Sequence, residues 1–253
     1  VERHARWLVE EGHTVDIIAW DREQIYPEFE QRNGYRICRK RHGWTKSAGA
    51  VRTWIRKKQF ITSLKIKADL LILNDTDTAN VSFDGKILLD IHDMAHTWPL
   101  MRGTTFIHKK AAKWMLKDAK KILKHSDSII TSAPGFQKWV KSEGYDSQVV
   151  MNRRKPENLE HALGKVVGYI GRIRDIQSMR HLISAAKKAG FRVIAAGDGL
   201  AVKQMLTEFP TLDYHGPFTE EQLPELIKEI SVMYAMYSTG RGNIAEGAIP
   251  TKM

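Results

Sequence analysis

The sequence has almost no cysteine and no long apolar segment. Cys38 is the only cysteine among 253 residues, so an internal disulfide is excluded and a reducing compartment is favoured over secretion. No apolar run approaches the roughly 18 residues that a membrane-spanning helix needs. The opening residues Val1, Glu2 and Arg3 are typical of an amphipathic helix rather than of a secretory signal. We therefore expect a cytoplasmic protein.

The sequence is also poor in acidic residues relative to basic ones. Forty Lys and Arg stand against 29 Asp and Glu, a formal net charge of +11, which favours an anionic partner. Most of the excess precedes residue 150. Between Gln31 and Lys67 there are 12 basic residues and no acidic residue. This region is the strongest candidate for contact with a polyanion.

Apolar residues recur at helical spacing within this basic region. Such a helix is typical of a peripheral contact with an anionic membrane surface at the inner face of a membrane. The residues predicted to make it are Arg52, Trp54, Arg56, Lys57 and Lys58. A solvated helix with an ordinary core stripe is the alternative. Nucleic acid is disfavoured, because no zinc-finger or RNA-recognition pattern is present.

Short apolar runs alternate with helical patterns along the whole chain, which predicts α/β units with parallel sheets covered on both faces. At 42% hydrophobic residues, the length allows two such units. Predicted strands are 15–20, 70–73, 87–91, 128–131, 148–151, 166–170, 192–196, 212–214 and 232–237. Predicted helices are 3–10, 45–64, 106–124, 135–143, 177–188, 200–208 and 220–230. The polar stretch 152–163 is predicted to connect the units, with domains 1–155 and 156–253.

Polar residues follow the predicted strands, where parallel sheets bind their ligands. Asp75 and Asp77 follow the strand 70–73, and such a pair can hold a divalent cation or accept backbone N–H groups at a helix start. His92 and Asp93 follow the strand 87–91. His92 and His96 are four residues apart, which is weak evidence for a metal without a third ligand. A histidine at a strand end is better suited to hydrogen-bonding a polar substrate.

Two glycine turns follow strands in the second half of the chain. Gly171 is followed by Arg172 and Arg174, and the next strand is followed by Gly197-Asp198-Gly199. Such turns let backbone N–H groups approach phosphates, and guanidinium groups bind the same oxygens. Each turn alone is more typical of a simple tight turn, but together they favour a phosphate or nucleotide site.

The ordered set of these segments resembles the GT-B glycosyltransferases, specifically the large retaining group called family 4. The resemblance covers nearly the whole chain and rests on the segments Gly12-His13-Thr14-Val15, Asn74 to Thr78, Ile87 to Asp93, Ser128 to Ser132, Val149 to Asn152, Gly168 to Arg172, Gly197 to Gly199, His215 to Phe218, Asn243 and Pro250 to Lys252. It implies two Rossmann-like, doubly wound parallel-sheet domains that face a cleft. The first would bind the acceptor and the second the nucleotide sugar.

The resemblance also implies a reaction and roles for single residues. A hexose would pass from a UDP- or GDP-sugar to a glycan or lipid-linked acceptor, with no metal or other cofactor. The implied catalytic residues are His92, Arg172 and Glu246. The implied donor-binding residues are Gly171, Arg174, Gly197, Asp198, Gly199, Asn243, Pro250 and Lys252. Asp75, Asp77 and Asp93 would lie on the acceptor side.

The sequence departs from the family pattern in three places. Ser178 stands where the family has a lysine, with Arg174 or Arg180 as candidate substitutes. The family has two paired glutamates. Gly247 occupies the position of the first glutamate, with Glu246 beside it, and the position of the second would fall after Met253. The first strand and its glycine-rich turn are missing before Val1, so we expect a chain truncated at both ends. The alternatives are a non-catalytic protein that binds sugar nucleotides or polyanions, and a GT-B sugar-nucleotide epimerase.

Overall fold

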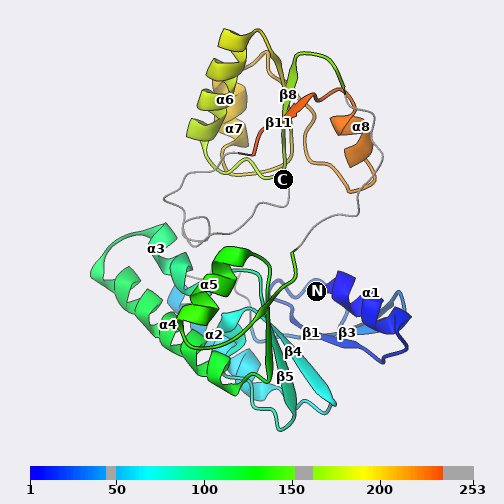
Figure 1. Cartoon of the computed structure of the whole chain (residues 1–253), viewed down its shortest axis with the longest axis vertical. Coiled ribbons are helices and arrows are strands. Elements are labelled where there is room, and N and C mark those ends of the chain that lie inside the picture. Colours follow the sequence, from blue (N-terminus) through cyan, green and yellow to red (C-terminus); the bar gives the residue numbers. More distant parts are fainter. Residues whose placement is uncertain (44–49, 152–161, 236–253) are drawn as a thin grey trace. The chain divides into compact units, whose positions relative to one another are not determined.

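The computed structural model describes residues 1–43, 50–151 and 162–235. The chain divides into two compact units, Val1–Val150 and Met151–Met253 (Figure 1). The predicted boundary after residue 155 lies outside the described residues. Each unit contains parallel β-sheet and α-helices, so the predicted α/β class with parallel sheets is confirmed.

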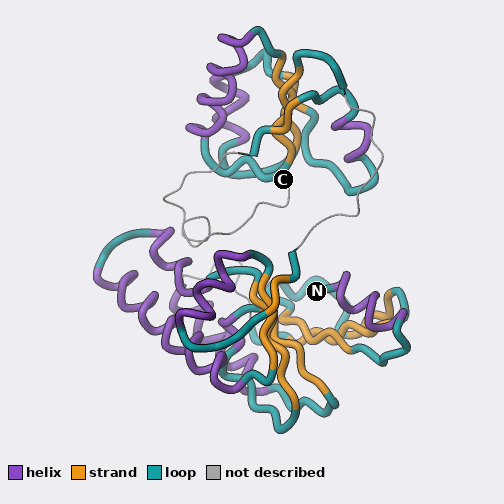
Figure 2. The backbone as a smooth tube through the Cα atoms, viewed as in Figure 1, coloured by secondary structure: helices purple, strands orange, loops and turns teal. Residues whose placement is uncertain are grey.

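The first unit contains two separate sheets, shown as orange tube in Figure 2. One has the strand order β1-β3-β2 and the other the order β4-β5-β6-β7. Their strands are β1 (Asp16–Trp20), β2 (Phe29–Arg32), β3 (Tyr35–Lys40), β4 (Leu70–Asn74), β5 (Lys86–Ile91), β6 (Ser128–Thr131) and β7 (Gln148–Val149). All pairs are parallel except β2 with β3.

The helices of the first unit are α1 (Glu2–Glu10), α2 (Ala50–Ser63), η1 (Thr76–Thr78), η2 (Ala95–Thr97), α3 (Trp98–Arg102), α4 (Phe106–His125) and α5 (Pro134–Ser142). Helix α1 packs on β1 and β3, with Ala5 buried against Tyr35 and Ile37. Helix α4 contacts β5, and its buried residues Ala112, Ala119 and Leu123 recur at helical spacing. Leu89 and Ile91 of β5 are fully buried, which fixes the register of this strand.

The second unit is one parallel sheet with the order β10-β9-β8-β11. Its elements are β8 (Val166–Ile170), α6 (Ile176–Ala189), β9 (Arg192–Ala196), α7 (Val202–Glu208), β10 (Asp213–Tyr214), α8 (Leu223–Ile227) and β11 (Val232–Met233). Helices α6 and α7 cover one face and α8 the other (Figure 1). Asp175 caps the start of α6, because its side chain accepts a hydrogen bond from the Ser178 amide at 2.8 Å, and Gly190 caps its end in the left-handed conformation.

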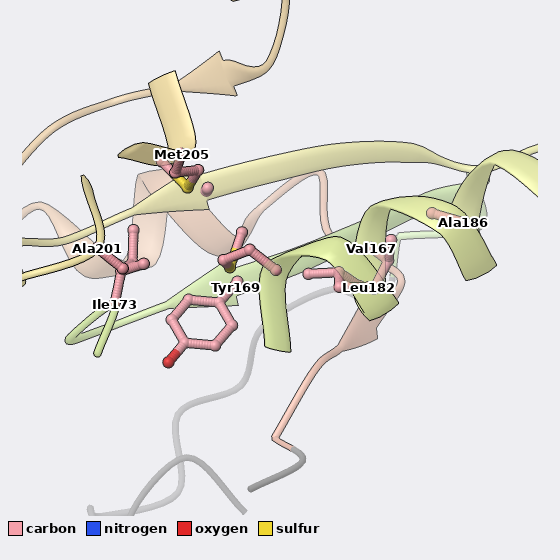
Figure 3. Close-up of a cluster of buried hydrophobic side chains, with 9 residues drawn as sticks. Val167, Tyr169, Ile173, Leu182, Ala186, Ala201 and Met205 are labelled. Atoms are coloured by element: carbon pink, nitrogen blue, oxygen red, sulfur yellow. The ribbon is translucent and has the colours of Figure 1, made fainter. Parts of the chain in front are cut away.

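Side chains of β8 alternate between two hydrophobic clusters. Val167 and Tyr169 lie with Leu182 of α6 and Met205 of α7 (Figure 3). Val166 and Ile170 instead pack with residues of β9, α8 and the following segment. All five residues of β8 are buried, as expected for the central strand of a doubly wound sheet.

The structure differs from the sequence-based prediction at the basic region. Residues 29–40 form the antiparallel hairpin β2–β3, which the pattern did not indicate. Helix α2 is described from Ala50, and the predicted start at residue 45 lies outside the described residues. Helix α8 is shorter than the predicted span 220–230, and residues 236 and 237 of the last predicted strand are not among those described.

Candidate functional site

The carboxyl end of β5 carries a buried carboxylate paired with a histidine. Asp90 is 2% exposed and points away from the core face that Leu89 and Ile91 form. Its Oδ2 lies 2.8 Å from His92 Nε2. This hydrogen bond raises the pKa of His92, against the opposing effect of burial. The predicted site residue His92 is therefore held in one orientation by a charged partner.

A second histidine reaches the same carboxylate from helix α1. His4 Nδ1 lies 3.2 Å from Asp90 Oδ2. Burial lowers the pKa of His4, and the nearby Asp90 carboxylate opposes that shift. Sequence reasoning missed His4, because 86 residues separate it from Asp90 and only the packing of α1 brings them together.

Asp75 ties the ends of β4 and β5 together. Its backbone has φ 64°, a left-handed conformation that is uncommon for residues other than glycine. Its Oδ1 accepts the amides of His92 at 2.7 Å and Asp93 at 2.8 Å. Burial raises the pKa of Asp75, and these two amide hydrogen bonds oppose the shift. Asp75 therefore holds the backbone that carries His92. The sequence placed Asp75 on the acceptor side and did not predict this structural role.

Asp77 contacts the amine of Lys57, a residue that the sequence assigned to the membrane-facing surface. The side chains are 15% and 27% exposed. Burial lowers the pKa of Lys57 to about 8, and the Asp75 carboxylate opposes this shift. The nearby Arg22 cation lowers this pKa further, whereas the Asp77 contact favours the charged amine. Lys57 therefore belongs to the polar cluster at the end of β4.

Much of the basic region is neutralised by acidic residues from other parts of the chain. Arg36 pairs with Asp16 at 2.6 Å, and Arg39 pairs with Glu30 at 2.6 Å. Arg32 and Arg41 also form ion pairs, with Glu2 and Glu30 and with Asp21 respectively. The absence of acids within the segment 31–67 therefore does not mean an unpaired patch in space.

The exposed part of the predicted membrane surface lies on α2, next to an exposed tryptophan of α4 that the prediction did not include. Trp54 stacks on Trp114 with ring centroids 4.9 Å apart, and Lys58 Nζ lies 5.7 Å from the Trp54 centroid. Trp114 is 58% exposed and Trp54 37%. Arg52 is exposed, whereas Arg56 is half-buried and donates to Gln59 at 3.0 Å.

The glycine turns of the second unit pack against each other. The Gly171 amide donates to Ala196 O at 2.8 Å, and the Gly197 amide donates to Gly216 O at 2.7 Å. A Cβ atom at Gly197 would lie 2.1 Å from Gly171 O, and one at Gly199 would lie 2.0 Å from Ile173 O. Close backbone packing therefore requires glycine at positions 197 and 199. The amides of Gly171 and Gly197 hydrogen-bond to backbone carbonyls of the protein and do not point to a phosphate.

The charged residues of these turns are exposed. Arg172, Arg174 and Asp198 all point to solvent, and in the described part of the chain neither arginine forms an ion pair. Arg180 instead forms a two-point ion pair with Glu208 at 2.6 and 2.8 Å, so it is a poor substitute for the family's lysine. Asn243, Glu246, Pro250 and Lys252 lie outside the described residues.

Two further findings concern only the described residues, 1–43, 50–151 and 162–235. In these ranges no three His, Cys, Asp or Glu side chains are grouped so that they could hold a metal ion. Within the same ranges, each helix is too short or too polar to cross a membrane.

No family model and no curated protein matches the chain. Among solved structures, it is similar to a mutant of S. aureus TarM in complex with fondaparinux, alpha-GlcNAc-glycerol and UDP. The identity is 13% and the TM-score 0.49. The match covers 71% of this chain and 39% of the TarM chain, so this chain spans less than half of that protein's length.

Proposed function

We propose that the chain is part of a retaining glycosyltransferase that moves a hexose from a UDP- or GDP-sugar to a glycan or lipid-linked acceptor. The observation that carries the proposal is that each unit gathers its polar groups at the carboxyl ends of parallel strands. The first unit presents His92 held by buried Asp90, and the second presents Arg172 and Arg174 beside packed glycine turns. Ligands of doubly wound sheets bind at these strand ends.

The chemistry assigns a different role to each unit. His92 contacts the transferred sugar, and Arg172 stabilises the negative charge that grows on the diphosphate. The bond from the anomeric carbon to the diphosphate oxygen breaks with its electron pair on that oxygen, and a fixed cation helps most where this charge develops. The acceptor hydroxyl oxygen forms the new bond to the anomeric carbon, and its proton passes to the departing diphosphate oxygen. Glu246, Asn243, Pro250 and Lys252 keep their predicted roles, and no metal is assigned.

Binding of the free nucleoside diphosphate tests the donor half of the proposal. We expect calorimetry to show binding of UDP or GDP to the full chain, and Arg172→Ala to weaken it at least about tenfold, because a charge-assisted hydrogen bond to phosphate contributes roughly 1.5 to 3 kcal/mol. Lys188→Ala, an exposed cation at the far end of α6, is the matched control. Equal affinities of the two variants, or no binding of either nucleotide, would overturn the donor assignment.

We also propose that the exposed faces of α2 and α4 dock on an anionic membrane, where a lipid-linked acceptor lies. Trp54 and Trp114 supply an aromatic surface, and Arg52, Lys58, Lys110, Lys113 and Lys117 are exposed around it. Aromatic side chains insert at the headgroup level, and each nearby cation contributes about 1 kcal/mol at an anionic leaflet.

Flotation with liposomes tests this docking surface. At low salt the chain should float with phosphatidylglycerol vesicles and not with phosphatidylcholine vesicles. The double variant Trp54→Ala, Trp114→Ala should lose most of the bound fraction. The control variant Phe29→Ala, which removes an exposed aromatic side chain on β2, should keep the bound fraction of the wild type. Flotation that is absent in the wild type, or equal in both variants, contradicts the membrane proposal.

A further inference from the structure

Helix α1 and strand β5 place two imidazoles on either side of one carboxylate oxygen. Asp90 Oδ2 lies 3.2 Å from His4 Nδ1 and 2.8 Å from His92 Nε2. The ring centroids are 6.1 Å apart and the planes differ by 37°. The Asp90 side chain is 3% exposed, while the histidine side chains are 25% and 30% exposed. The carboxylate is thus buried and both rings reach solvent.

This arrangement favours one tautomer of each neutral ring. A carboxylate only accepts, so His92 donates to Asp90 from Nε2. His4 Nδ1 lies within ion-pair distance of the same oxygen, and the negative charge of Asp90 favours a proton on the nitrogen that faces it. The other nitrogen of each neutral ring is then an acceptor. Within the described residues, no protein group hydrogen-bonds to His4 Nε2 or His92 Nδ1. Two acceptors are therefore available to a ligand.

An exposed aromatic ring lies beside the pair. Trp7, one turn after His4 on α1, stacks on the His4 ring with centroids 5.7 Å apart and planes 29° apart. Trp7 is 45% exposed. A few fixed polar groups beside an aromatic surface suit a ligand with hydroxyl groups and an apolar face, and a sugar ring has both.

We propose that His4, His92 and Trp7 form a subsite for the hydroxyl groups of a carbohydrate, and that Asp90 is the positioning residue that fixes both imidazoles. The proposal deepens the proposed function and rests on it, because it gives His4 a share in the sugar contact assigned to His92.

The shared carboxylate also makes the pair asymmetric as the pH falls. The hydrogen bond to Asp90 raises the pKa of His92, whereas burial lowers the pKa of His4, so His92 gains its second proton first. His92 Nδ1 then becomes a donor while His4 Nε2 stays an acceptor. The charged groups that act on the pair are Asp90, Asp75, Arg3 and the Val1 amino group.

Nitrogen-15 NMR of the imidazoles in the full chain tests the positioning step. At a pH above both histidine pKa values, His4 should show its N–H at Nδ1, the less common tautomer of a free histidine. Asp90→Asn should lower the pKa of His92 and return His4 to a mixture of tautomers. His4 with its N–H at Nε2 in the wild type, or an unchanged His92 titration in Asp90→Asn, overturns the positioning role. Neither readout depends on activity.

Titration with simple sugars tests the subsite itself. The probes are the methyl glycosides of glucose, galactose, mannose and N-acetylglucosamine, with glycerol as the polyol control. At least one glycoside should shift the His4 and His92 imidazole signals saturably. In His4→Gln the remaining His92 signal should show several-fold weaker affinity for the glycoside. In His13→Gln, which changes an exposed histidine after α1, the affinity should equal that of the wild type. Tryptophan fluorescence confirms that each variant is folded. No shift with any of the four, equal shifts with glycerol, or equal affinity in His4→Gln contradicts the subsite.

The two proposals fail in different ways. Sugar-dependent imidazole shifts without UDP or GDP binding would keep the subsite and overturn the transferase. Nucleotide binding that is lost in Arg172→Ala, together with histidines that no glycoside shifts, would keep the donor site and overturn the subsite.

Discussion

The two units hold their polar groups in opposite ways. In the first unit, the carboxylates at the strand ends are buried or half-buried, and each has a protein partner: Asp90 contacts two histidines, Asp75 accepts two backbone amides, and Asp77 contacts Lys57. In the second unit, the cations at the strand ends are exposed. There it is the backbone amides of the glycine turns that hydrogen-bond within the protein.

The difference matches the two ligands that we propose. Buried and paired groups keep one geometry when a ligand arrives, which suits the orientation of a neutral molecule such as a sugar. Exposed arginines on a rigid turn remain hydrated until an anion replaces the water, which suits a phosphate. The first unit is thus arranged around side-chain electrostatics and the second around backbone shape.

The largest effect is expected where backbone shape is broken. Gly197→Ala would place a methyl group 2.1 Å from Gly171 O at φ 130°, so it should destabilise the second unit by at least about 3 kcal/mol. All seven tryptophans lie at or before Trp139, in the first unit. Far-UV circular dichroism should therefore show an earlier denaturant transition while the tryptophan transition stays in place.

Gly190→Ala is the matched control for this substitution. Gly190 also has a left-handed backbone, with φ 70°, but a Cβ there meets nothing within 4 Å. It should cost only about 1 to 2 kcal/mol. Equal destabilisation by the two alanines would mean that the interlocked turns do not set the stability of the second unit.

A smaller, pH-dependent effect is expected where buried charge is removed from the first unit. Folded Lys57 loses its proton at about pH 8, whereas the unfolded chain keeps it up to about 10.5. Between these values the unfolded state binds more protons, so the free energy of unfolding should rise with pH, by up to about 3 kcal/mol from this group. Lys57→Met should lack that rise in denaturant titrations followed by tryptophan fluorescence.

Lys58→Met, at the exposed neighbouring position, is the control and should keep the wild-type pH dependence. If Lys57→Met follows the wild-type curve from pH 8 to 10.5, then Lys57 is hydrated in the folded protein. The contrast between the buried polar groups of the first unit and the exposed cations of the second would then lose its main support.

The central strands could be predicted from sequence because burial alone specifies them. The apolar runs 70–73, 87–91, 128–131, 166–170 and 192–196 differ from β4, β5, β6, β8 and β9 by at most one residue at each end. Strands buried on both faces have continuous apolar sequences, and no helix of adequate length fits such short runs.

The hairpin β2–β3 could not be predicted in the same way. Its strands alternate apolar residues with Arg32, Arg36 and Arg39, and in sequence the cations dominate the pattern. Their partners Glu2, Asp16 and Glu30 lie outside the basic stretch 31–67, on α1, β1 and β2 respectively. A local count of charge therefore suggested a polyanion surface where tertiary pairing produces a partly neutral one.

The candidate site shows the same division. His92, Asp75 and Asp77 were found because strand ends can be located from apolar runs. His4 and the inward position of Lys57 were missed, since both depend on how α1 and α2 pack and not on neighbouring residues. For His4, the only sequence signal was the helical spacing of apolar residues in α1. That spacing indicates that one face of the helix is buried, but it does not indicate which strand the face packs against.

The interlocked glycine turns also restrict how the second unit can change during evolution. The turn after β8 and the turn after β9 contact each other through Gly171 O, Ile173 O, Gly197 and Gly199. A side chain or an inserted residue in one turn must be matched by a rearrangement of the other. Substitutions are therefore expected to be tolerated first at the exposed positions 172, 174 and 198, where the side chains point to solvent.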